Sequence, residues 1–340
     1  MGTLNPALFP HAGRGIRWSV AGLLREDQFK MLVVMAWKEV LECGKYYMNL
    51  QKCWNWASLL LAGAAIVAVA SGQSWAAEKA PKRLLVVTVT KGFRHSSIPT
   101  AEKVLAELGA KSGAFTVDYA RVEPTDADFK GADGKPDQAK VDAAIVRVLA
   151  EKMNATALKN YDGVVFANTT GTLPLPDEAA FLDWIKSGKA FIATHSAADM
   201  FHHKDGEVDP YIDMLGAEFK EHHEQATVEC LNQDLRHPAT RAIGKSYVVK
   251  DEIYLMKNFS RDRVHGLLSL DKHPNTGGAG DYPIAWCRKY GKGNVFYTSL
   301  GHREDVWESP IYQAHLLGGI KWALGLEQGN AVPQKTLSAQ

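Results

Sequence analysis

The sequence has almost no excess charge of either sign. Its 39 lysine and arginine residues balance 38 aspartate and glutamate residues, giving a formal net charge of +1 at pH 7. A nucleic-acid partner requires basic residues to neutralise phosphates, so this balance argues against one. Hydrophobic residues make up 46% of the chain, an ordinary globular proportion that excludes a largely disordered protein.

Cysteine is scarce. Four are present, and Cys43 and Cys53 lie in a part that we expect to be removed. Cys230 and Cys287 each lie in a strand-like run. One disulfide and two buried free thiols are both open interpretations.

Three common catalytic signatures are missing. Residues 193–197 read ATHSA, so the G-x-S-x-G elbow of serine hydrolases is absent. Neither the H-E-x-x-H zinc helix nor the G-x-x-x-x-G-K phosphate loop occurs, and we expect no nucleotide cofactor.

One long apolar run stands near the N-terminus. Lys52 precedes the apolar stretch Ala57–Ala70, and small residues follow at Ser74–Ala77. This pattern predicts a secretory signal peptide over residues 48–77; a retained signal anchor is the alternative. We expect residues 1–47 to be a non-native extension before a true start at Met48. The mature protein is then periplasmic or extracellular, without a stable membrane span, and its oligomeric state is open.

The remaining chain alternates strand and helix patterns. Expected strands lie at 83–90, 115–122, 164–167 and 190–193, and expected helices at 98–109, 139–152, 176–187 and 311–324. Further strands are expected at 226–231, 247–250, 264–270, 283–288 and 294–300, mostly without helices between them. This order predicts a doubly wound, mostly parallel α/β sheet with antiparallel additions in its second half.

Histidines follow three of these strands. The apolar run at 190–193 stops at Thr194, His195 and Ser196, and we expect a helix to start there. His95 and His302 occupy similar positions after two other strands. Carboxyl ends of parallel strands share one edge, so the three imidazoles are expected to meet in one crevice. A merely structural role is the alternative for each.

More polar candidates lie in the second half. His202 and His203 are adjacent, as are His222 and His223, and on an extended segment only one of each pair can enter the site. Glu252 follows a strand-like run and supplies a carboxylate of the kind that a general base or a metal ligand requires.

Five ordered motifs together resemble the ThuA-like family. They are KGFRHSSI (91–98), DGVVFANTTG (162–171), AFIATHSAAD (190–199), DEIY (251–254) and YGKGNVFYTSLGH (290–302), within a similarity over residues 83–325. The segment 131–153 departs from the family pattern, and 326–340 is a tail. The resemblance implies a flavodoxin-like fold of the class I glutamine amidotransferase type. In those enzymes a cysteine occupies the elbow, where this chain has His195, so glutamine hydrolysis is not expected.

The resemblance also implies carbohydrate metabolism. We expect an exported enzyme, an isomerase, lyase or hydrolase, that acts on a sugar or keto-glycoside. The expected catalytic residues are His195, His302, Glu252 and Asp199. Those expected to bind the sugar are Arg94, Ser196, Asn168, Tyr254 and Trp307. A divalent metal such as zinc, held by His95, His195, His302 and His222 or His223, is one interpretation, and metal-free acid–base catalysis is another. A non-catalytic sugar-binding protein and a hydrolase using Ser196 are the alternative functions.

Overall fold

The computed structural model describes residues 80–203 and 206–334. The signal-peptide prediction and the expected extension at 1–47 therefore lie outside the described residues. Within the described ranges, no helix is both long and apolar enough to cross a bilayer.

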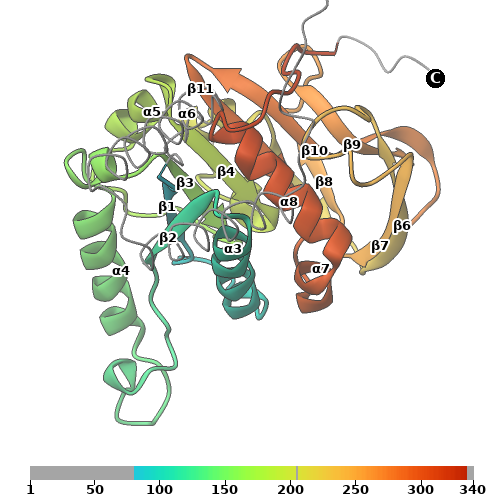
Figure 1. The fold of residues 1–340 in the computed structure, drawn as a ribbon. Coiled ribbons are helices and arrows are strands. Elements are labelled where there is room, and N and C mark those ends of the chain that lie inside the picture. Colours follow the sequence, from blue (N-terminus) through green and yellow to red (C-terminus); the bar gives the residue numbers. More distant parts are fainter. Residues whose placement is uncertain (1–79, 204–205, 335–340) are drawn as a thin grey trace, which may run out of the picture. The chain divides into compact units, whose positions relative to one another are not determined.

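A nine-stranded sheet forms the centre of the described chain (Figure 1). Its strands, in spatial order, are β2 (Phe115–Ala120), β1 (Lys82–Val87), β3 (Gly163–Ala167), β4 (Ala190–Thr194), β11 (Gly293–Thr298), β10 (Ala279–Tyr290), β9 (His265–Lys272), β6 (Ala226–Asn232) and β7 (Ser246–Asp251). The first five are parallel, and every later pairing is antiparallel. The predicted α/β sheet with a parallel first half and an antiparallel second half is confirmed.

Helices cover both faces of the sheet. One face carries α3 (Ile98–Ser112), α7 (Glu304–Glu308) and α8 (Pro310–Ala323), and the other carries α4 (Gln138–Lys152), α5 (Glu178–Lys186) and α6 (Pro210–Leu215). Each face has its own buried apolar cluster. Every residue of β3 and β4 is buried, and apart from Thr194 at the end of β4 none has a polar side chain, as expected for strands covered on both faces.

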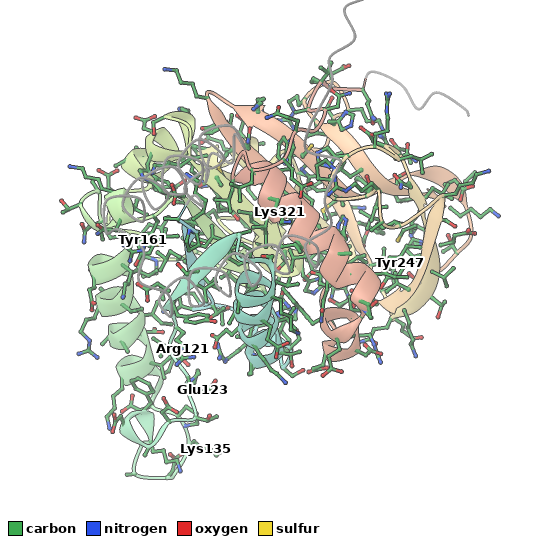
Figure 2. The ribbon with its side chains drawn as sticks, viewed as in Figure 1. Arg121, Glu123, Lys135, Tyr161, Tyr247 and Lys321 are labelled. Atoms are coloured by element: carbon green, nitrogen blue, oxygen red, sulfur yellow. The ribbon has the colours of Figure 1, made fainter. Side chains whose placement is uncertain are left out.

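Several short elements complete the fold. They are the 3₁₀ turns η2 (Ala127–Phe129), η3 (Ala157–Asn160) and η4 (His195–Ala198), and a separate antiparallel pair, β5 (Glu218–His222) with β8 (Tyr254–Lys257). The prediction of a helix after β4 is wrong, because only the single 3₁₀ turn η4 follows the strand. The segment 131–153 forms part of a loop and the whole of α4. Lys135 lies at the tip of this loop, which projects away from the sheet (Figure 2).

The antiparallel half of the sheet bends back toward the parallel half. Strand β7 is an edge strand, and three strands separate it from β11. Nevertheless, Asp251 at the end of β7 accepts a 2.7 Å hydrogen bond from the backbone N–H of Gly301, just after β11. Tyr247 on the same strand also lies 3.2 Å, oxygen to oxygen, from Ser309 between α7 and α8. This curvature brings the end of β7 to the edge where the parallel strands end.

Both cysteines of the described chain are buried and free. Of the two interpretations left open by the sequence, the free thiols are the ones observed. Burial raises the pKa of each thiol, which keeps both protonated near neutral pH.

Candidate metal and active site

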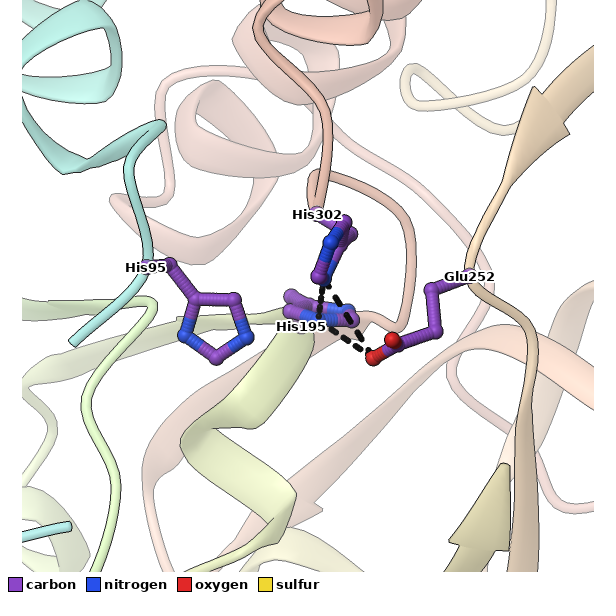
Figure 3. Close-up of side chains that lie close together, drawn as sticks. All are labelled: His95, His195, Glu252 and His302. Atoms are coloured by element: carbon purple, nitrogen blue, oxygen red, sulfur yellow. Dashed lines mark hydrogen bonds and ion pairs between the residues drawn. The ribbon is translucent and has the colours of Figure 1, made fainter. Parts of the chain in front are cut away.

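Four side chains converge where the parallel strands end. His95, His195, Glu252 and His302 each offer a nitrogen or oxygen atom, and these atoms all lie within 4.8 Å of one another (Figure 3). His95 follows β1, His195 follows β4 and His302 follows β11, whereas Glu252 comes from the end of β7. The expected meeting of the three histidines is therefore observed.

His195 stands at the centre of the group. It is fully buried and has a φ of 44°, a left-handed conformation that non-glycine residues rarely adopt. Its Nδ1 lies 2.8 Å from the carbonyl oxygen of Ser299, which only accepts hydrogen bonds. In the neutral ring Nδ1 therefore carries the proton, and Nε2 presents its lone pair to the cluster. The ring of Tyr254 packs against it at 4.3 Å.

Three donor atoms of the cluster form a nearly equilateral triangle. His302 Nδ1 lies 3.3 Å from His195 Nε2 and 3.3 Å from Glu252 Oε2, and the latter two atoms are 3.5 Å apart. Ligand atoms about 2.1 Å from a tetrahedral ion lie about 3.4 Å from one another. Three imidazole and carboxylate donors at this spacing fit a divalent metal, and His95 stands on the remaining side (Figure 3).

Glu252 and His302 each stabilise the charged form of the other. Burial opposes ionisation of Glu252, but the neighbouring His195 and His302 rings hold the pKa of this carboxyl well below its usual range. The hydrogen bond that His302 donates to the Glu252 carboxylate raises the pKa of His302. Behind them, Asp251 accepts the backbone N–H groups of Gly301 and Arg303, which flank His302.

His95 is held as a neutral ring. Burial, followed by the neighbouring imidazoles, lowers its pKa to about 3, so it keeps a free lone pair at neutral pH. Its Nδ1 lies 3.4 Å from the hydroxyl oxygen of Ser196. Ser196 is fully buried in this contact, so it orients His95 rather than facing a ligand.

Of the adjacent residues His222 and His223, only one reaches the cluster, as expected for an extended segment. His222 Nδ1 lies 3.3 Å from Glu252 Oε1, and its side chain is 43% exposed at the rim of the cluster. His223 instead lies beside the ring of His273, away from the cluster. His202 and His203 both lie outside it, paired with Asp199 and Asp209 respectively.

Several other predicted site residues have internal partners. Asp199 lies outside the four-residue group and pairs with His202 at 2.6 Å. Arg94 pairs with Glu123 at 2.7 Å. Each side chain is held in its ion pair, and neither belongs to the group of His95, His195, Glu252 and His302.

Asn168 and Trp307, both predicted to bind the sugar, lie in the interior of the described chain. Asn168 is fully buried, and its amide contacts Ser97, Thr194 and the carbonyl of Gly301. Trp307 is also fully buried and donates its indole N–H to Gly301. Neither side chain is exposed to solvent in this structure. Tyr254 is 3% exposed and contributes a ring that supports His195.

Sequence reasoning missed the groups that orient the cluster. The carbonyl of Ser299 has no sequence signal, because every residue carries one. Asp251 stands next to Glu252, but its role depends on the curvature of the sheet, which strand patterns do not reveal.

The fold and the cluster together define an α/β protein whose mixed sheet is parallel in its first half and antiparallel in its second, with a histidine at the strand-end elbow. The ThuA family model, described as trehalose utilisation, matches residues 83–323, and the chain belongs to this family. A ThuA-like protein from Parabacteroides merdae shares 19% identity at a TM-score of 0.55, covering 76% of this chain and 96% of that one. A ThuA-like protein from Bacteroides uniformis shares 21% identity at a TM-score of 0.52, with coverage of 74% and 95%. No curated protein matches the chain.

Proposed function

We propose that this protein is a metal-dependent enzyme that processes a sugar or keto-glycoside. The observation that carries the proposal is the triangle of His195, His302 and Glu252 donor atoms, whose edges of 3.3 to 3.5 Å match a metal site. The family description, trehalose utilisation, supports a sugar as the substrate. His95, His195, Glu252 and His302 would hold the ion.

The exposed histidine at the rim of the cluster could act as a general base in an elimination or isomerisation next to a ketone. A divalent ion bound here would polarise a substrate carbonyl. A ketone at C3 of a glycoside acidifies the C2–H bond. When that proton is removed, its electron pair forms the C1=C2 double bond, the C1–O bond breaks, and the leaving glycosidic oxygen takes up a proton from the solvent. His222 is exposed beside Glu252 and is the imidazole available to take this proton, since the other three face the ion.

Among the residues that the structure describes, no thiol lies at the cluster. Neither Cys230 nor Cys287 belongs to the cluster, and both are buried with raised pKa values. The elbow position, where a thiolate would attack glutamine, holds the ring of His195. The proposal therefore excludes amidotransferase activity.

Metal content measured together with turnover tests the proposal. The full chain is purified, analysed for metals before and after chelation, and assayed for cleavage of 3-keto-trehalose. We expect about one divalent ion per chain, with turnover lost on its removal and restored by zinc. Full turnover without metal would contradict the metal role and leave His/Glu acid–base catalysis. Neither metal nor turnover on any keto-glycoside would favour a sugar-binding protein.

We further propose that the protein is exported. The support is the basic, apolar and small-residue pattern of residues 48–77. N-terminal sequencing of the native product should find a start near Glu78. A product that retains residues 14–45 would contradict both the export signal and the start at Met48.

A further inference from the structure

One aromatic ring stands in solvent beside the cluster. Phe93 is 67% exposed, whereas most of the large apolar residues in the described chain are buried. Exposure alone is not informative, because single apolar residues on a surface are ordinary. What distinguishes Phe93 is how its backbone is held and which ring it touches.

The backbone of Phe93 is fixed to the loop that follows β3. Its carbonyl accepts hydrogen bonds from the hydroxyl groups of Thr170 (2.8 Å) and Thr90 (3.3 Å). The N–H of Lys91 donates to the carbonyl of Thr170 at 3.0 Å. At Gly92 a Cβ atom would lie 2.8 Å from the Thr170 hydroxyl, so only glycine allows this close approach. The exposed ring is thus carried by an anchored loop.

The ring of Phe93 continues a row of rings that leads into the cluster. It meets His95 edge to face, with 4.9 Å between centroids and 84° between planes. His95 in turn lies 4.8 Å from His195 and 5.1 Å from His302. Phe93 therefore borders the cluster on the side of His95, and His222 borders it on the side of Glu252.

From this placement we infer that Phe93 is the platform on which the pyranose ring of the substrate stacks. The inference rests on the proposed function and narrows its substrate class. A gluco-configured pyranose has equatorial hydroxyls and axial C–H bonds, which present an apolar face to an aromatic ring. A sugar stacked there has its edge directed at His95 and the metal donors. An open-chain polyol has no such rigid face, so the site selects closed rings.

Two substitutions in the full chain separate ring stacking from mere bulk. Phe93→Leu keeps an apolar side chain of similar size without a π face, and Phe93→Trp enlarges that face. Binding of trehalose is followed by saturation-transfer NMR and titration, with sorbitol as the open-chain probe. Metal content and turnover of 3-keto-trehalose are measured on the same samples.

We expect trehalose C–H protons to receive saturation in the wild type, and sorbitol protons to receive none. Phe93→Leu should weaken trehalose binding and raise KM for 3-keto-trehalose about tenfold. Phe93→Trp should keep the wild-type trehalose affinity and the wild-type KM. The metal content should be the same in both variants as in the wild type. Unchanged binding in Phe93→Leu, or no trehalose binding by the wild type, would overturn the platform. Binding that depends on Phe93 without any turnover would support the platform and contradict the proposed enzyme.

Discussion

At the scale of single residues, Glu252 supplies the negative charge of the cluster. It contacts His195, His302 and His222 through its two oxygens. Glu252→Gln keeps the shape of the side chain and removes this charge. We expect metal affinity, measured by competition with a chromogenic chelator, to fall at least about 100-fold, with turnover falling alongside.

Glu221→Gln is the matched control for this substitution. Glu221 lies on β5 and pairs with Lys220 at 2.7 Å, outside the cluster. Metal affinity and turnover should be unaltered in this variant. If Glu252→Gln bound metal as tightly as the wild type, Glu252 would not be a ligand, and the metal interpretation of the triangle would fail.

At the scale of elements, Asn168 ties together the loops that carry the three histidines. Its Nδ2 donates to Ser97, after His95, and to the carbonyl of Gly301, before His302. Its Oδ1 accepts from Thr194, the residue before His195. Asn168 has a φ of 53°, so Asn168→Gly removes the side chain without straining the backbone.

We expect Asn168→Gly to lower Tm by about 5 °C and to weaken metal binding. The loss of buried hydrogen bonds costs about 1 kcal/mol each, and the ligand loops then lose their common anchor. Asn258→Gly is the matched control, because Asn258 is also left-handed (φ 57°) but lies outside the cluster. A drop in Tm without any loss of metal affinity would show that Asn168 stabilises the fold but does not position the ligands.

The meeting of His95, His195 and His302 was predictable because it depends on one topological rule. Strands β1, β4 and β11 are parallel, so their carboxyl ends share an edge, and a histidine in the turn after each is brought to it. The parallel strands themselves were predictable from apolar runs of strand length. Alternation with helical patterns then gave the fold class.

The position of Glu252 was not predictable in the same way. It reaches the cluster only because the antiparallel half curls until Asp251 meets the N–H of Gly301, and curvature leaves no periodic pattern in the sequence. The β5–β8 pair was missed for a related reason: Glu218–His222 is polar, so no apolar alternation marks it as a strand. The prediction of a helix after His195 was wrong because it depended on Ala197 and Ala198, and alanine is as compatible with a single compact turn as with a helix.

At the scale of the whole molecule, two buried histidines outside the cluster couple stability to pH. His237 and His315 approach Ala239 from two sides: the N–H of Ala239 donates to His237 Nδ1 at 3.1 Å, and His315 Nδ1 donates to its carbonyl at 2.8 Å. Burial lowers the pKa of each histidine from 6.5 to about 4. Both are therefore neutral in the folded protein where they would be charged in the unfolded chain.

This difference makes the protein less stable in acid. The unfolded chain takes up a proton at each histidine below pH 6.5, whereas the folded chain does so only below about pH 4. The contribution of the two histidines to the free energy of unfolding is therefore fully present above pH 6.5, and it is lost as the pH falls from 6.5 to about 4. For His315 alone the loss between pH 7 and pH 5 is about 2 kcal/mol. Glu178, whose pKa burial raises to about 7, acts in the opposite direction. A comparison of variants is therefore needed to isolate His315.

His315→Asn keeps a donor toward Ala239 and cannot take up a proton in this range. Urea unfolding of the wild type and the variant at pH 7 and pH 5 gives two free-energy differences. We expect the fall in unfolding free energy on acidification to be smaller in the variant by about 2 kcal/mol. His223→Asn, a substitution at the surface, is the control: its unfolding free energy should fall on acidification by as much as that of the wild type. If His315→Asn showed the full wild-type fall, protonation of His315 would have no part in acid unfolding, and the charge change would have to be sought at His237 or in the cluster.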